Sequence, residues 1–158
     1  MTSVPDALGP EVALVCRVGA RRCALPLHQV QETLRPLPIE PLAGTPRFVL
    51  GVAIVRGEPL PVVDALDLVG GERGAGAERF VVVKAGDRRV ALAVGAIEGV
   101  RSLAPGSLAA LPPLLRDASD EAIAAIGSLD GELLLALRSA RLVSDSVWRS
   151  LDARQART

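Results

Sequence analysis

The sequence predicts an all-β protein made of two small barrels that pack against each other. Three observations support this fold class: short apolar segments have a two-residue period, Gly and Pro mark turns between them, and the whole pattern occurs twice. The chain has 158 residues, of which 49% are apolar and 2% are aromatic. It can therefore bury a core, and that core must consist mainly of Val, Leu, Ile and Ala.

The first apolar segment has the periodicity of a strand. In residues 12–18 every second side chain is apolar and falls on one face. Gly19-Ala20 follows, and Gly at the first loop position suits a type II′ hairpin turn. Residues 22–27 then return as a second strand. In that register Cys16 faces Cys23, and we expect two small, buried, reduced side chains rather than a redox pair.

The remaining elements follow from apolar runs bounded by turn residues. Further strands are predicted at Phe48–Val55, Leu60–Val63, Phe80–Ala85, Arg89–Val94 and Leu133–Leu137. Short helical pieces or bends are predicted at His28–Leu34 and Ala96–Val100, a loop with one helical turn at Asp117–Ala125, and a terminal helix at Ser144–Arg154. Asp64 ends a buried strand, so it is expected to cap nearby backbone N–H groups.

An internal repeat links the two halves of the chain. Arg21-Arg22 recurs as Arg88-Arg89, an offset of 67 residues (88 minus 21). Four further residues match at the same offset: Gly19, Ala24, Leu25 and Val30 correspond to Gly86, Ala91, Leu92 and Ile97. Later, Arg56-Gly57-Glu58 corresponds to Asp130-Gly131-Glu132, and each triplet precedes an apolar strand. Each half therefore holds the strands of one small barrel.

The repeat suggests a division of the chain at its Gly-rich stretch. We expect a flexible tail at 1–10, a first barrel at 11–70, a junction at 71–78, a second barrel at 79–143, and a C-terminal helix and tail at 144–158. A barrel of ~60 residues alone buries too little surface to be stable. The two barrels are therefore expected to pack together, and the groove between them is a natural partner site.

Charge and composition exclude several classes of function. Lys plus Arg and Asp plus Glu each number 18, so the formal net charge is zero. Binding to nucleic acid or to an anionic membrane normally needs a basic surface, and base stacking needs aromatics. No apolar run reaches the ~20 residues of a membrane helix, and Met1–Glu11 lacks the pattern of a signal peptide. We expect a cytoplasmic protein without nucleic-acid binding or membrane insertion.

The residues of the sequence form no evident catalytic or metal constellation. His28 is the single histidine, and no Cys and His pair has zinc-ligand spacing. Gly71–Gly76 lacks the Lys-Ser or Lys-Thr of a phosphate loop. Asp64 and Asp67 have no third group with which to perform acid–base chemistry. We therefore expect a non-enzymatic binding module with no cofactor and no metal.

Three stretches of the chain resemble the CheW family of bacterial chemotaxis coupling proteins. They are RRCALPLHQVQETLRPLPIEPLAGTPRFVLGV, IVRGEPLPVVDAL and FVVVKAGDRRVALAVGAIEGV, and the resemblance extends from Val12 to Leu142. It implies two SH3-like five-stranded barrels. It also implies an adaptor that couples chemoreceptor signalling tips to the regulatory domain of a CheA-type histidine kinase, within arrays that can include other CheW-like proteins. The chain is too short for a kinase core, so a stand-alone adaptor is expected.

The resemblance also implies two sets of site residues. Receptor-binding positions fall on Val30, Gly51, Ile54, Arg56 and Phe80. Positions at the interface with the kinase or another adaptor fall on Glu32, Gly95 and Arg138. From sequence alone, Arg56 is equally well explained as an exposed turn residue or as a partner-binding arginine.

This chain departs from the family pattern at three of those positions. Ile54 stands where the family usually has Asn, and Gly95 and Arg138 stand where it usually has Asp. A reversal of charge at a contact disfavours association. The alternative function is therefore an array component that binds receptors or other adaptors but no longer binds the kinase.

Overall fold

The computed structural model describes residues 12–69, 77–104, 106–110 and 122–156. The predicted tail at 1–10 and most of the junction at 71–78 and of the loop at 117–125 lie outside these residues. No helix of the described residues is long and apolar enough to cross a membrane.

The described chain is mostly β-structure, as predicted. Its strands are β1 (Val12–Val18), β2 (Arg21–Pro26), β3 (Val30–Leu34), β4 (Val49–Val55), β5 (Glu58–Asp64), β6 (Arg79–Ala85), β7 (Arg88–Val94), β8 (Ala96–Ser102), β9 (Leu108–Ala110), β10 (Ile123–Leu129) and β11 (Glu132–Leu137). Its helical elements are η1 (Leu27–Gln29), α2 (Ala65–Leu68), η2 (Ser139–Arg141) and α4 (Asp145–Ala156). The Asp64 carboxylate accepts from the Leu66 N–H at 3.1 Å, so its predicted capping role at α2 is confirmed.

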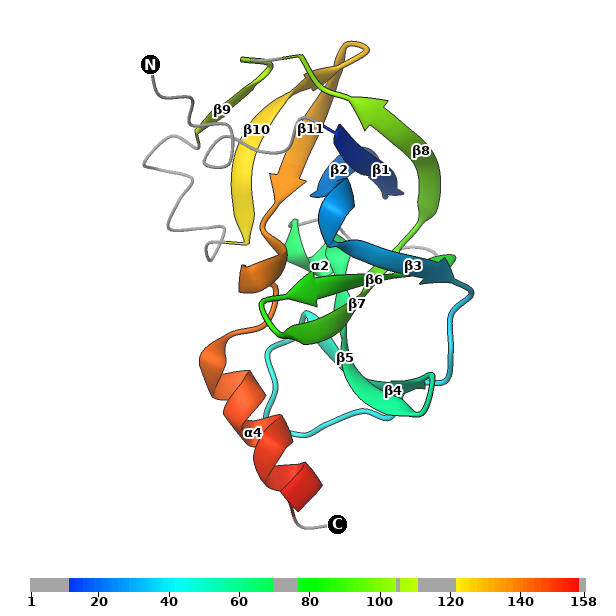
Figure 1. Cartoon of the computed structure of the whole chain (residues 1–158), viewed down its shortest axis with the longest axis vertical. Helices are drawn as coiled ribbons and strands as arrows, with labels where there is room; N and C mark the ends of the chain where they lie inside the picture. Colours follow the sequence, from blue (N-terminus) through cyan, green and yellow to red (C-terminus); the bar gives the residue numbers. More distant parts are fainter. Residues whose placement is uncertain (1–11, 70–76, 105, 111–121, 157–158) are drawn as a thin grey trace.

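The strands form two mixed sheets, one above the other in Figure 1. The six-stranded sheet has the order β8-β1-β2-β11-β10-β9, and the five-stranded sheet has the order β3-β6-β7-β5-β4. Each sheet has its own buried cluster, so the predicted pair of small barrels is confirmed, with β9 as an extra short strand.

The strand pairing does not follow the predicted division of the chain at residues 71–78. The β1–β2 hairpin of the first half lies in the sheet of β8 to β11. The β6–β7 hairpin of the second half lies between β3 and β5. Each barrel therefore combines strands from 11–70 with strands from 79–143, because the two halves exchange their hairpins.

The exchange preserves the internal repeat down to single residues. In one sheet Val15 pairs with Gly99, and in the other Val82 pairs with Glu32, so both partners differ by the same 67-residue offset. The register shift next to Val15 also recurs next to Glu32. The repeat seen in the sequence is therefore a structural pseudo-symmetry between the two barrels.

Two predicted helical pieces are wrong in the same way. His28–Leu34 contains only the short turn η1 before it becomes strand β3, and Ala96–Val100 belongs to strand β8. Val30 and Leu34 lie four residues apart, a spacing that places side chains together on a helix and also on one face of a strand. Both segments form strands because they pair with the exchanged hairpins, β3 with β6 and β8 with β1.

A shared core joins the two barrels. The exchanged hairpins bury both faces of their strands: Leu14, Cys16 and Cys23 lie in the shared cluster, whereas Val15 and Ala24 point into their own barrel. The β6–β7 hairpin does the same with Val81 and Leu92 on the shared side. Strands buried on both faces need continuous apolar runs, which explains the sequences of residues 80–83 and 90–94.

The predicted register of the first hairpin is confirmed, since Cys16 pairs with Cys23 across β1 and β2. Both thiols are free and fully buried. Burial raises the pKa of each thiol to about 12, and the nearby Glu98 carboxylate adds to the effect at Cys16.

We predict that neither Cys16 nor Cys23 reacts with a thiol reagent in the native protein, because the thiolate is the reactive form. Labelling with dithiobis(nitrobenzoate) at mildly alkaline pH should show no fast phase, and two thiols should react once denaturant is added. A fast native reaction of one thiol would contradict the burial of this pair.

Candidate functional site

Arg56 occupies the tip of the β4–β5 hairpin. Its φ is 51° and that of Gly57 is 81°, as a type I′ turn requires. The side chain is 74% exposed, yet it reaches the β3 carboxylate of Glu32: Nε lies 3.0 Å from Oε2 and Nη2 lies 3.1 Å from Oε1. This two-bond contact raises the pKa of Arg56. Arg56 is thus an exposed turn residue that is already held by an ion pair.

The contact brings together two positions that the resemblance assigns to different partners. Arg56 was expected on the receptor side and Glu32 on the kinase side. In the structure they bridge β3 and the β4–β5 turn, and β3 and β4 are the two edges of the five-stranded sheet. The ion pair therefore spans the opening of this barrel, where strand pairing stops.

Ile54 and Val30 lie on the outside of the same barrel with different surroundings. Ile54 is on β4 and is 61% exposed, a large apolar side chain facing solvent. Val30 is half-buried and packs against the shared core. Ile54 is therefore available to a partner, whereas Val30 offers only part of its surface.

Gly51 is fixed by close backbone approach. Residue 40 pairs with residue 52 in both directions, with N–O distances of 2.8 and 2.9 Å. A Cβ on Gly51 would lie 2.1 Å from the Glu40 carbonyl oxygen, and the φ of 145° disfavours any other residue. Gly51 thus allows the chain around Glu40 to cover the free edge of β4.

Phe80 is not a surface residue. It is 0% exposed and belongs to the buried cluster inside the five-stranded barrel. On β6, Phe80 and Val82 point into the barrel, whereas Val81 and Val83 point to the shared core. The Phe80 side chain is therefore core, and it is not exposed for the predicted receptor contact.

Gly95 and Arg138 lie apart from the Glu32 ion pair. The Gly95 N–H donates to the Arg17 carbonyl at 2.9 Å, and a Cβ there would lie 2.9 Å from that same oxygen. Arg138 is exposed directly after β11, and its backbone N–H donates to the Ala122 carbonyl at 2.7 Å. Close packing explains the glycine at 95, and the Arg138 side chain faces solvent.

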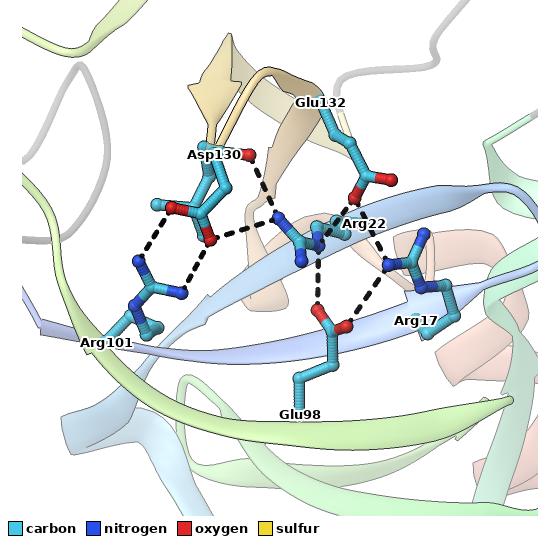
Figure 2. A network of polar contacts seen from close by, with 7 residues as sticks. Arg17, Arg22, Glu98, Arg101, Asp130 and Glu132 are labelled. Atoms are coloured by element: carbon cyan, nitrogen blue, oxygen red, sulfur yellow. Dashed lines mark hydrogen bonds and ion pairs between the residues drawn. The ribbon is translucent and has the colours of Figure 1, made fainter.

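Sequence reasoning missed a six-residue charge network on the six-stranded barrel, shown in Figure 2. Its members are Arg17 (β1), Arg22 (β2), Glu98 and Arg101 (β8), Asp130 (the β10–β11 turn) and Glu132 (β11). Arg22 Nε lies 2.8 Å from Glu98 Oε1 and 3.0 Å from Glu132 Oε2. Arg22 Nη1 also donates to the Leu129 carbonyl at 2.9 Å. Three cations and three anions thus balance each other.

The repeat contains the signal that could have located part of this network. Arg22 contacts Glu132, and the equivalent residues Arg89 and Glu58 form the corresponding ion pair in the other barrel. Asp130 takes the place of Arg56 at the matching turn, with a φ of 54°, and pairs with Arg101 at 3.0 Å. The two turns therefore have the same backbone and opposite charge.

A second missed cluster attaches the terminal helix α4, which lies beside the five-stranded barrel in Figure 1. Arg88 Nη1 and Nη2 donate to the two carboxylate oxygens of Asp152 at 2.9 and 2.6 Å. The Arg88 guanidinium also lies 4.6 Å from the centre of the Trp148 ring. The hydrogen bonds from Arg88 lower the pKa of Asp152.

The described residues offer no metal site: no three His, Cys, Asp or Glu side chains among them are grouped to hold an ion. His28 is exposed in η1.

We predict that Gly51→Ala lowers the free energy of unfolding by about 3 kcal/mol, since it adds a collision with Glu40 to an unfavourable φ. Gly99→Ala is the matched control, because Gly99 also has a positive φ of 128° but has nothing within 4 Å of its Cβ position. That control should cost about 1 kcal/mol. Urea unfolding measures both, and equal losses would contradict the close approach at Gly51.

We predict that acid loosens α4 from the barrel. The pKa of Asp152 is lowered in the folded protein. The ionised carboxylate therefore stabilises the folded state fully above the unfolded-state pKa, and this stabilisation is lost as the pH falls through the folded-state pKa. Below about pH 4 the Trp148 emission should therefore shift to the red. Asp152→Asn should show the red-shifted emission already at neutral pH, and identical titrations of both proteins would contradict the Arg88 contact.

Comparison with known proteins agrees with this architecture. The model of the CheW-like domain matches residues 12–147. The protein FrzA of Myxococcus xanthus is 34% identical over 125 residues, which cover 77% of this chain and 78% of FrzA. The crystal structure of the scaffolding protein TtCheW from Thermoanaerobacter tengcongensis superposes with a TM-score of 0.71 at 21% identity, covering 82% of this chain and 89% of that one. The chain belongs to the CheW-like family.

Proposed function

We propose that this protein is a non-enzymatic chemosensory adaptor that couples the signalling tips of chemoreceptors to the regulatory domain of a CheA-type kinase in cytoplasmic arrays. Its membership of the CheW-like family and its similarity to FrzA support a role of this kind. The observation that carries the proposal is the surface of the β4–β5 hairpin. There, the exposed Ile54 lies two residues before the exposed Arg56, and the resemblance to the family implies receptor contact at both positions.

The chemistry of this surface suits a protein partner. Arginine is among the residue types enriched at the hot spots of protein interfaces, and the exposed apolar side chain beside it can lose water contact when a partner binds. Glu32 holds the Arg56 guanidinium in place, so little side-chain entropy is lost when a partner carboxylate approaches. The signalling tip of a receptor is a helical hairpin, which can lay an apolar stripe along Ile54 and an acidic residue against Arg56.

A second candidate function is an adaptor that binds receptors or other CheW-like proteins without the kinase. Arg138 favours it, because this exposed cation stands where the family usually has an acid. The two candidates differ only in whether the kinase regulatory domain binds.

We predict that Arg56→Glu weakens binding of a receptor signalling tip by at least about tenfold, because it removes the cation and places a second carboxylate beside Glu32. Isothermal titration calorimetry measures the affinity, and circular dichroism confirms the fold. Arg101→Glu makes the same change of charge at the two-bond ion pair with Asp130 on the six-stranded barrel, and this variant should bind normally. Unchanged affinity of the Arg56 variant would remove Arg56 from the contact.

A parallel titration against the kinase regulatory domain separates the two candidate functions. Coupling predicts binding of the unmodified protein, and Arg138→Asp should then leave the affinity equal or better. Absence of heat with the kinase domain, together with normal receptor binding, would support the second candidate. Recovery of kinase binding in Arg138→Asp would then identify the charge at 138 as the cause.

A further inference from the structure

The outer face of the β4–β5 hairpin is apolar and is partly covered in the folded protein. In the pairing of β4 with β5, Ile54 lies opposite Pro59 and Val52 lies opposite Pro61. Ala53, which lies between them along β4, and Val55, which follows Ile54, point into the barrel. The four residues therefore lie on the face of the hairpin that points away from the barrel interior, here called the hairpin patch (Val52, Ile54, Pro59 and Pro61). Ile54 is exposed, Val52 and Pro59 are half-buried, and Pro61 is buried.

Helix α4 turns one side of the hairpin patch into a groove. Trp148 and Leu151 of α4 line an open pocket of about 170 Å³ together with Val52, Pro59 and Pro61. Trp148 is half-buried and Leu151 buried, so the indole ring forms a wall whose outer part remains accessible. The groove has room for one apolar side chain of a partner.

The charged residues at the rim of the groove include one more carboxylate than arginines. Three acids and two arginines line it: Glu58, Asp87, Asp152, Arg88 and Arg89. Arg88 pairs with Asp152, and Arg89 pairs with Glu58. Asp87, at the exposed β6–β7 turn, has no ion-pair partner among the described residues. The rim therefore favours a partner that brings one positive charge.

The position of Trp148 is set by the same rim. The Arg88 guanidinium lies over its ring while it holds Asp152 by two hydrogen bonds. The planar guanidinium is fixed by the two hydrogen bonds to Asp152, so its contact with the Trp148 ring favours one orientation of the indole. Arg88 thus acts as a positioning residue for the wall of the groove.

The other barrel carries different residues at the positions equivalent to the hairpin patch. By the repeat, Ser128 takes the place of Ile54 and Leu133 takes the place of Pro59. Leu133 is 47% exposed, and the terminal helix α4 lies beside the five-stranded barrel (Figure 1). The residues of the hairpin patch are therefore not repeated in the other barrel, and Leu133 provides a matched control.

We propose that the groove between α4 and the hairpin patch takes an apolar side chain from a helical segment of the receptor tip, with a Lys or Arg about one helical turn away on Asp87. This inference rests on the proposed function, because the groove continues the Ile54–Arg56 surface. It adds Trp148 and Asp87 to the contact. The partner helix lies along α4, with its basic residue at the β6–β7 turn.

The single tryptophan of the chain makes this contact directly measurable. Titration with a Trp-free fragment of a chemoreceptor signalling tip should shift the Trp148 emission to the blue, with the same midpoint as the calorimetric titration. Trp148→Ala should weaken binding about tenfold or more. Asp87→Lys, at an exposed turn, should weaken it about fivefold and reduce its dependence on salt.

The controls separate this inference from the proposed function. Leu133→Asp removes an exposed apolar side chain from the other barrel and should bind like the unmodified protein, and Trp148→Phe should retain most of the affinity if Trp148→Ala loses its fold. The groove assignment would be overturned if the receptor fragment bound by calorimetry without changing the Trp148 emission and if Asp87→Lys bound with unchanged affinity. The proposed adaptor function would stand in that case. Absence of heat with the receptor tip would instead overturn the proposed function, and the groove assignment with it.

Discussion

The shared core between two exchanged hairpins is the contact on which the rest of the molecule depends. Neither hairpin belongs to the barrel of its own half, so neither barrel is complete without strands from both halves. Leu14 and Cys16 on one side meet residues such as Val81 and Leu92 on the other. The interior of each barrel is small and filled largely by Ala, Val and Leu, so the shared layer supplies much of the buried apolar surface.

Because both faces of the exchanged hairpins are buried in the core, the side chains that a partner can reach lie on the outer strands and turns. The two pseudo-equivalent turns carry Arg56 and Asp130 on the same backbone conformation. On one barrel the surrounding charges form a balanced network, and on the other a pair of ion pairs surrounds an apolar patch. The repeated scaffold thus carries two different faces, and within the described residues the face near Ile54 combines apolar surface with the terminal helix.

Local patterns predicted the hairpin strands β1, β2, β4 to β7 and β11 but not β3, β8, β9 or β10, and the repeat predicted the symmetry. The two-residue period of residues 12–18 and the Gly19 turn led to the correct Cys16–Cys23 register. The hairpin exchange could not be predicted, because a parallel contact such as Ala24 with Ala136 leaves no trace in local sequence. Phe80 was misplaced since a family position says nothing about side-chain direction. The groove formed by Trp148 was missed because it depends on how α4 docks.

Unfolding in urea, followed at once by Trp148 emission and by far-ultraviolet circular dichroism, tests the shared core most directly. Trp148 reports on the five-stranded barrel, whereas the dichroism reports on the strands of both. Exchanged hairpins predict a single transition with the same midpoint and slope for both signals. A Trp148 transition that leaves a substantial part of the strand signal intact would show that the barrels fold separately, and would contradict the shared core.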